Sequence, residues 1–284
     1  MLNTYKNTNF IGFESTYEDA TVVMFGAPFD GTTSFRPGTR FAPSTIRSES
    51  FGIETYSPYL DLDVEDFNIC DIGDVDLPFG NTQKVLNELF NVTDKILTDN
   101  KKPFMIGGEH LVSLPVIQSL YKKYPNLHIV HFDAHTDLRD EYLGEMLSHA
   151  TVIRRAWDLV GDNKIFQFGI RSGTKNEFEW SSKHTYMNKF DLATLENVCE
   201  NLVDVPVYLT IDLDVLDPSV FCGTGTPEPG GITMKELLKS LDFLKTLNLV
   251  GADVVELSPH YDNSGTSTAV ACKMVREIGL LLSK

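Results

Sequence analysis

Cysteine and long apolar runs are both scarce in this sequence of 284 residues. Its four cysteines, Cys70, Cys199, Cys222 and Cys272, are far apart and form no CxxC pair. This pattern excludes a disulfide framework and a zinc ribbon. No apolar run approaches the roughly 20 residues that span a bilayer, and the first residues contain no apolar segment behind a basic start. We therefore expect a cytoplasmic protein that is not embedded in a membrane.

Positively charged residues are also scarce. The chain has 24 Lys and Arg against 40 Asp and Glu, which gives a formal net charge of −16 at pH 7. Binding to a nucleic-acid backbone or to an anionic membrane requires clustered Lys and Arg, so we expect neither as a partner. The acidic excess instead favours metal ions or small cationic molecules.

Short apolar runs alternate with amphipathic segments along the chain. The runs are rich in β-branched residues and nearly continuous, which is typical of strands buried on both faces of a parallel sheet. The amphipathic segments repeat their apolar residues at helical spacing. The predicted strands span residues 21–26, 103–108, 127–133, 164–170, 205–212 and 249–257, and the predicted helices span residues 83–97, 111–124, 193–203, 233–247 and 268–284.

This alternation predicts an α/β protein with three layers, in which helices cover both faces of a central parallel sheet. No Pro-, Ser- or Gly-rich linker, repeat or low-complexity run divides the chain, so we expect a single domain over residues 1–284. Residues 27–80 are rich in Gly, Pro and aromatic residues. We expect this segment to be irregular and to supply surface loops or an edge of the sheet.

Polar clusters follow four of the predicted strands. They are Gly107–His110, Asp133–Asp137, Asp212–Asp217 and Glu256. In an open parallel sheet, ligands bind at the carboxyl ends of the strands, so clusters that are far apart in the sequence can converge there. The sequence therefore predicts one functional site at this edge of the sheet.

Two of these clusters have the spacing of metal ligands. Asp133, His135 and Asp137 stand at positions i, i+2 and i+4, which point to one side of an extended segment. Asp212 and Asp214 repeat the i, i+2 spacing. Carboxylates brought into one cavity repel each other unless cations bind. With histidine nitrogen and no thiolate, such a set suits a pair of Mn²⁺ ions better than structural zinc.

Simpler interpretations stay open for each motif alone, because single Asp residues commonly cap helices or turns at strand ends. An EF-hand is excluded, since its sixth position would be Asp217 instead of Gly and its twelfth would be Gly223 instead of Glu. A binuclear phosphoesterase is disfavoured, because the sequence lacks the Gly-Asn-His segment that such enzymes usually carry.

Seven motifs follow one another along nearly the whole chain: GAPFDGTTSFRPGTRFAPSTIR, GGEH, DAHTD, LSHATVIRR, TIDLDVLDPSV, GTGTPEPGG and VVELSP. Together they resemble the ureohydrolase family of arginases and agmatinases, and within it the agmatinase branch. The resemblance implies an arginase-like three-layer fold with a site for two Mn²⁺ ions. The implied ligands are His110, Asp133, Asp137 and Asp212 for one ion, and His135, Asp133, Asp212 and Asp214 for the other, with Asp133 and Asp212 bridging.

The resemblance also implies hydrolysis of a guanidino group to urea and an amine. A guanidinium carbon is stabilised by resonance, so water alone is too weak a nucleophile, and two metal ions lower the pKa of a water molecule between them. By the resemblance, Asp137 orients the hydroxide, Glu256 pairs with the guanidinium and His149 protonates the departing amine. The resemblance also implies that Thr226 helps to orient the substrate. Simpler alternatives are that His149 packs or caps a helix, that Glu256 is only a carboxylate at a strand end, and that Thr226 lies in a turn.

Substrate choice rests on residues 138–148. Arginases place Asn and Ser residues there to bind the amino-acid end of arginine, and this segment contains no Asn, which disfavours arginine. We expect Asp140 and Glu141 to attract the ammonium group of agmatine, whose cleavage gives putrescine and urea. Arg139 keeps a guanidino acid such as 4-guanidinobutyrate as an alternative.

A second class of function is a non-catalytic relative that binds metal or a polyamine as a regulator. Such a relative would be marked by a lost ligand, a missing His149 or a replaced Glu256, and the sequence retains all of them. The resemblance further implies a homo-oligomer, either a trimer or a hexamer.

Overall fold

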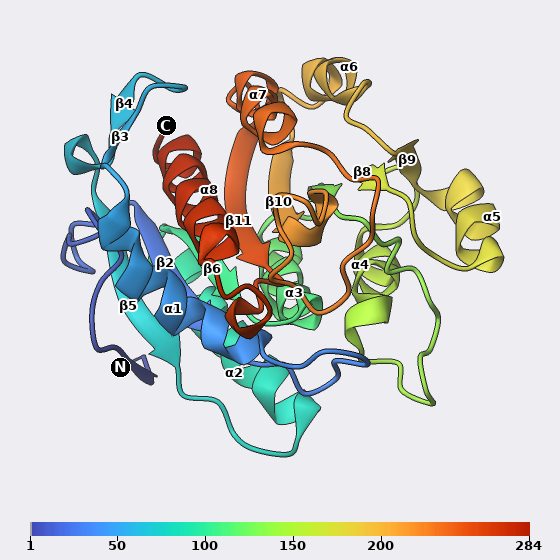
Figure 1. Cartoon of the computed structure of the whole chain (residues 1–284), viewed down its shortest axis with the longest axis horizontal. Helices are drawn as coiled ribbons and strands as arrows, with labels where there is room; N and C mark the ends of the chain where they lie inside the picture. The colour runs from blue at the N-terminus through green and yellow to red at the C-terminus, as the bar shows by residue number, and fades with distance from the viewer. Residues whose placement is uncertain (1) are drawn as a thin grey trace.

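The computed structural model describes residues 2–284, and within them the central element is a sheet of nine strands (Figure 1). From one edge to the other, the strands are β1 (Thr4–Tyr5), β5 (Ile69–Val75), β2 (Val22–Ala27), β6 (Lys102–Gly107), β11 (Asn248–Val255), β10 (Pro206–Asp212), β7 (His128–Phe132), β8 (Ile165–Ile170) and β9 (Tyr186–Lys189). Neighbouring strands are parallel, except that β1 pairs with β5 in the antiparallel direction. A separate small sheet joins β3 (Tyr56–Ser57) to β4 (Leu62–Asp63).

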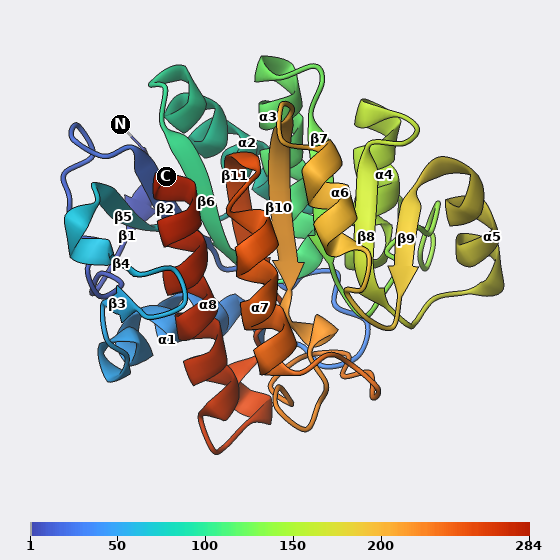
Figure 2. The ribbon, with the colours of Figure 1, turned by 90° about the horizontal axis from the view of Figure 1, so that it is seen from above.

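Helices cover both faces of the large sheet (Figure 2). One face carries α2 (Thr82–Thr98), α3 (Ser113–Lys123) and α4 (Val152–Val160), and the other carries α6 (Leu195–Asn201), α7 (Met234–Leu244) and α8 (Thr266–Ser283). The helix α1 (Ala42–Glu49) packs against α8, and α5 (Lys175–His184) packs beside β9 at the edge. The predicted three-layer arrangement is confirmed. Within the described part of the chain, no helix is both long and apolar enough to cross a membrane.

Burial on both faces explains why the strands are continuous apolar runs. In β2, Val22 and Met24 belong to the hydrophobic cluster on one side of the sheet, whereas Val23 and Phe25 belong to the cluster on the other side. All four side chains are fully buried, so neither face of the strand favours polar residues. The six predicted strands and five predicted helices are confirmed, with small shifts at their ends.

The expectation for residues 27–80 needs a correction, because this segment contains α1 and the seven-residue strand β5. Asp71 and Asp74 lie inside β5 and interrupt its apolar pattern. Arg47 of α1 compensates for these charges: its Nε lies 2.7 Å from Asp71 Oδ2, and its Nη1 forms an ion pair with Asp74. This pairing is made only in the folded chain. The sequence pattern also does not indicate β1, β9, α4 or α5.

We expect replacement of Arg47 with Met to lower the free energy of unfolding by about 3 to 5 kcal/mol, because it leaves two buried carboxylates without their partner. Guanidinium-induced unfolding, followed by circular dichroism, measures this change. Lys122→Met is the matched control, since Lys122 pairs with Asp94 at 2.8 Å on the surface and such pairs contribute about 1 kcal/mol or less. Equal losses in the two variants would contradict the importance of the buried pairing.

Candidate metal centre

The polar clusters of the sequence follow four neighbouring strands in the middle of the sheet. These strands are, in spatial order, β6, β11, β10 and β7. Their carboxyl ends are level, because Val254 of β11 pairs with Ile106 of β6, and Ile211 of β10 pairs with Phe132 of β7. The side chains that follow these strands therefore meet at one place.

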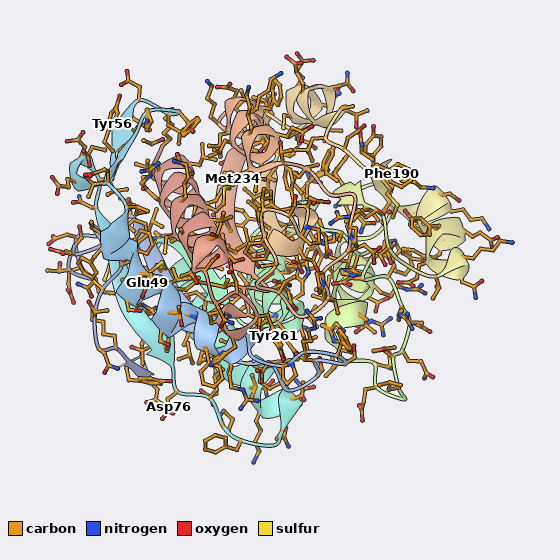
Figure 3. The ribbon with its side chains drawn as sticks, viewed as in Figure 1. Glu49, Tyr56, Asp76, Phe190, Met234 and Tyr261 are labelled. Carbon is orange, nitrogen blue, oxygen red and sulfur yellow. The ribbon has the colours of Figure 1, made fainter. Side chains whose placement is uncertain are left out.

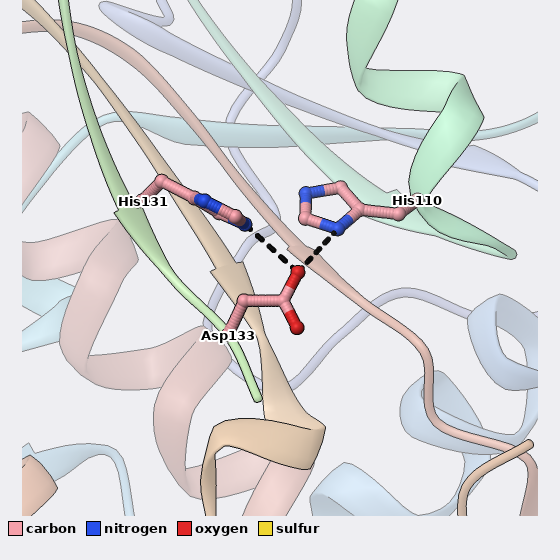
Figure 4. A group of neighbouring side chains, drawn as sticks. All are labelled: His110, His131 and Asp133. Carbon is pink, nitrogen blue, oxygen red and sulfur yellow. Dashed lines mark hydrogen bonds and ion pairs between the residues drawn. The ribbon is translucent and has the colours of Figure 1, made fainter. Parts of the chain in front are cut away.

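His110 follows β6, and its ring faces three carboxylates. The Nδ1 atom lies 3.2 Å from Asp133 Oδ2, 3.2 Å from Asp137 Oδ2 and 3.3 Å from Asp212 Oδ2. All four side chains are buried. Figure 4 shows the approach of His110 to Asp133. The structure thus brings together the four residues predicted to bind the first ion.

His135 approaches the other oxygen of Asp133. Its Nδ1 lies 3.4 Å from Asp133 Oδ1 and 3.0 Å from Asp214 Oδ2. The backbone N–H of Asp214 donates to Asp212 Oδ1 at 2.9 Å, which joins the last residue of β10 to the acid in the turn that follows it. Asp133 therefore presents one oxygen toward each histidine, an arrangement compatible with the bridging position predicted for it.

The hydrogen bonds around His110 place a proton on its Nε2 atom and turn its Nδ1 atom toward the carboxylates. Thr210 Oγ1 donates to Asp253 Oδ1 at 2.6 Å, and it therefore accepts from His110 Nε2, which is 3.0 Å away. A neutral ring with its proton on Nε2 has an unprotonated Nδ1. This atom is buried and has no hydrogen-bond partner among residues 2–284. In the neutral ring this nitrogen offers a lone pair beside three carboxylate oxygens, and that set of donors fits a metal cation.

Burial and mutual repulsion control the protonation of these acids. Burial, together with the charge of Asp133, raises the pKa of Asp137 to about 7. Burial and the neighbouring charges of Asp214 and Asp133 raise the pKa of Asp212 well above its usual range. Without a cation, protons therefore occupy part of the cluster near neutral pH.

Glu256 follows β11 and is held firmly at the edge of the cluster. Its Oε1 accepts from the backbone N–H of His110 at 2.8 Å, and its own N–H donates to the carbonyl oxygen of Gly108 at 3.0 Å. Its φ angle is 67°, and that of Asp137 is 52°. Residues with side chains rarely adopt this left-handed conformation, and such strain is concentrated at functional sites.

His149 is held near the cluster by a chain of hydrogen bonds that starts at Glu109. This buried carboxylate accepts from the backbone N–H and the hydroxyl of Thr32 at 2.9 and 2.5 Å. Thr32 Oγ1 accepts from the His149 N–H at 3.0 Å, and Ser34 Oγ lies 3.2 Å from His149 Nε2. Burial lowers the pKa of His149 to about 4, so its ring is neutral at pH 7.

Sequence reasoning gave no role to Glu109, Thr32 or Ser34. The available signal was the position of Glu109 inside the GGEH motif, next to His110. Its partners precede it by more than 70 residues, so only the folded structure shows that the two motifs meet.

A cavity of about 270 Å³ opens beside the cluster. Several predicted site residues line it, namely His135, Asp137, Asp212, Thr226, His149 and Glu256. Thr226 Oγ1 lies 3.5 Å from Asp214 Oδ2, so this threonine stands between the acids and the open space. The cavity is the place where a small substrate can reach both the cluster and Glu256.

Asp140 and Glu141 lie outside the cavity. Both are exposed, and within residues 2–284 neither lines this cavity. Asp140 instead pairs with Arg155 Nη2 of α4 at 2.8 Å. The contact of these two acids with the substrate stays a prediction, and the structure places both of them outside the lining of this cavity. Arg139 does line the cavity, with its guanidinium carbon 4.4 Å from the ring centre of Tyr142.

Comparison with known proteins identifies the class of protein. The sequence pattern of the arginase family matches residues 20–280. The chain therefore belongs to the arginase family, and the resemblance drawn from the motifs is confirmed, together with the arginase-like fold.

Individual members of the family show how similar this chain is to known enzymes. An agmatinase from Bacillus subtilis is 50% identical over 278 residues, which cover 96% of each chain. The solved structure of a candidate agmatinase from Clostridium difficile has a TM-score of 0.93 and 56% sequence identity, and the match covers 94% of this chain and 99% of the other. A guanidinobutyrase from Pseudomonas aeruginosa is 34% identical, over 89% of this chain and 83% of that protein.

We expect the affinity for Mn²⁺ to fall as the pH decreases below about 7, because protons on acids such as Asp137 compete with the metal. Each displaced proton contributes about tenfold per pH unit. Titration calorimetry in buffers of different ionisation enthalpy measures both the affinity and the protons released. Asp137→Asn should release fewer protons than the unsubstituted protein. An affinity independent of pH from about 8 to about 6 would contradict the description of the cluster.

Proposed function

We propose that this chain is an arginase-family hydrolase that cleaves agmatine to putrescine and urea with two Mn²⁺ ions. One observation carries the proposal: the buried His110 Nδ1 and the surrounding carboxylates lie beside a cavity that also contains the buried acid Glu256. A cationic guanidino compound complements that acid. The 50% identity to an agmatinase over nearly the whole chain supports agmatine as the substrate.

The residues that would hold the two ions are those brought together at the strand ends. They are His110, Asp133, Asp137 and Asp212 for one ion, and His135, Asp133, Asp212 and Asp214 for the other. Carboxylate oxygens and imidazole nitrogens without thiolate favour Mn²⁺ among the common divalent ions. When bound, the ions lower the pKa of water so that a nucleophilic hydroxide is available near neutral pH.

Glu256 is the residue proposed to bind the guanidinium. Burial, followed by the charge of Glu109, raises the pKa of Glu256 well above its usual range, so the carboxylate is costly to ionise in an empty site. A bound guanidinium offsets this free-energy cost, because it forms a charge-assisted pair with the carboxylate. The bond from His110 N–H to Oε1 fixes the carboxylate at the cavity wall, and Thr226 lines the same cavity to help orient the substrate.

Asp137 and His149 are proposed to handle protons. Asp137 lines the cavity and can accept a hydrogen bond from the attacking nucleophile, which it thereby orients. His149 is neutral at pH 7, and its Nε2 is directed to Ser34 Oγ near the cavity. It can pass a proton to the departing amine, because histidine is the side chain most often used for general acid–base catalysis.

A second candidate substrate is 4-guanidinobutyrate, favoured by the position of Arg139 at the cavity. Its positive charge would attract the carboxylate of a guanidino acid, and a guanidinobutyrase is among the relatives. Glu177 partly balances this charge, since its Oε2 lies 3.7 Å from Arg139 Nε. This partial balance weakens the attraction for a carboxylate, and the 50% identity to an agmatinase supports agmatine as the preferred substrate.

We infer that the chain forms one domain and acts in the cytoplasm as a homo-oligomer, a trimer or a hexamer, without nucleic-acid or membrane partners. All four cysteines are free thiols, which fits a reducing compartment. Large exposed aromatic side chains are available for subunit contacts. Figure 3 shows two of them, Tyr56 and Phe190, on opposite sides of the molecule.

Urea release from the Mn²⁺-loaded protein tests the reaction and the substrate together. We expect turnover to decrease in the order agmatine, 4-guanidinobutyrate, arginine. All three share the guanidinium that binds the buried acid, so the differences in turnover come from the tail of each compound. The absence of urea with all three compounds would refute the hydrolase and leave a metal-binding or polyamine-binding protein. A preference for the guanidino acid would refute agmatine alone.

Replacement of Glu256 with Gln is expected to reduce kcat/KM for agmatine about 100-fold or more, since losing one partner of a buried charge pair costs about 3 kcal/mol. The Mn²⁺ content, measured by elemental analysis, should stay unchanged. Glu141→Gln is the matched control and should change kcat/KM by about twofold or less, because Glu141 lies outside the cavity. An equal effect of both substitutions would remove the proposed role of Glu256.

A further inference from the structure

A chain of buried polar side chains lies behind Asp133, outside the predicted ligand set. His131 stands two residues earlier on β7, and its Nε2 lies 2.8 Å from Asp133 Oδ2. Gln167 is the partner of His131 on the neighbouring strand β8, and its Nε2 lies 3.1 Å from His131 Nδ1. Both side chains are fully buried. Figure 4 shows His110 and His131 approaching the same oxygen of Asp133.

The backbone fixes the orientation of the Gln167 amide. Gln167 Nε2 lies 2.9 Å from the carbonyl oxygen of Thr136, an atom that can only accept a hydrogen bond. The amide nitrogen, and not the amide oxygen, must therefore face Thr136. The hydroxyl of Thr185 donates to Gln167 Oε1 at 3.2 Å, so both ends of the amide are satisfied.

This orientation determines which nitrogen of His131 carries the proton. The second N–H of Gln167 donates to His131 Nδ1, which must accept and therefore holds a lone pair. The proton of the neutral ring is then on Nε2, from which it is donated to Asp133 Oδ2. With that proton in place His131 is not a metal ligand, although its ring nitrogen lies within 4.8 Å of ligand atoms of His110 and Asp133.

We propose that His131 and Gln167 are positioning residues that hold Asp133 in the orientation needed to bridge the two ions. The inference rests on the metal centre of the proposed function. Asp133 accepts at both oxygens, from His131 Nε2 at Oδ2 and from the His135 backbone N–H at Oδ1, at 2.5 Å. These two bonds restrain rotation of the carboxylate, so its remaining lone pairs would be available to the two ions. Partners of this kind change metal affinity about 10- to 100-fold.

The test replaces His131 with Phe, which keeps a planar ring and removes the hydrogen-bond donor. Mn²⁺ affinity, measured by competition with a chromogenic chelator, is expected to weaken about 10- to 100-fold with two ions still bound at saturation. His128→Phe is the matched control, because His128 lies on the same strand but at its other end, bonded to the carbonyl oxygen of Asn126 at 3.0 Å. It should leave the affinity unchanged within about twofold.

Two further measurements separate positioning from a structural role. At saturating Mn²⁺ the kcat of His131→Phe should return to within about threefold of the unsubstituted protein, whereas the metal-free variant should keep its unfolding midpoint.

Gln167→Leu should weaken Mn²⁺ binding by a smaller factor, since His131 remains but its proton is no longer directed. This second variant also provides the test if His131→Phe does not fold. Nitrogen NMR of protein labelled in histidine should show the Nε2–H form of His131.

The outcomes distinguish this inference from the proposed function. Unchanged Mn²⁺ affinity in His131→Phe, or in Gln167→Leu if only that variant folds, would overturn the positioning role even if urea is released. Loss of one of the two ions would also overturn it, because it would make His131 a direct ligand. A protein that binds Mn²⁺, loses affinity on substitution and releases no urea would retain the positioning role and lose the hydrolase.

Discussion

Repulsion among buried carboxylates is the constraint on which the rest of the structure depends. Asp133, Asp137, Asp212 and Asp214 meet beyond the level ends of β7 and β10, where all four side chains are buried. Charges in such a place must be compensated by cations, protons or hydrogen-bond donors. The structure provides donors from the backbone and from imidazole rings, and His110 Nδ1 is buried among the carboxylates with no hydrogen-bond partner in residues 2–284. The remaining compensation fits metal ions.

A second layer of the structure connects this cluster to the N-terminal part of the chain. Glu109 is satisfied by the loop that contains Thr32, and that loop also holds His149. Gly108 permits the contact, because a Cβ atom there would lie 1.9 Å from the carbonyl oxygen of Phe29. The close approach of two backbones thus brings a candidate proton carrier to the edge of the metal centre.

What could be predicted from the sequence depends on whether its physical cause is local. The apolar run of β2 and the alternate spacing of Asp133, His135 and Asp137 are local, so the sequence predicts both the strand and the convergence of these side chains. The partners of Asp71 in β5 and of Asp140 lie elsewhere in the chain. Because the partner of Asp71 is distant in sequence, the polar strand β5 could not be recognised from its own pattern. Because Asp140 pairs with Arg155, this acid lies outside the cavity. His131 carries no signal in its spacing, since its role arises from a neighbouring strand.

The central position of β11 also bears on the order in which the strands of the sheet pair. This strand is next to last among the regular elements of the chain, yet it lies between β6 and β10 and contacts both. A growing chain that has released only residues up to β10 has a sheet with its middle strand absent, so the two halves have no shared hydrogen bonds there. The side chains that follow β6 and those that follow β10 therefore come together only after β11 has paired with both strands. Such long-range pairing is intrinsically slow.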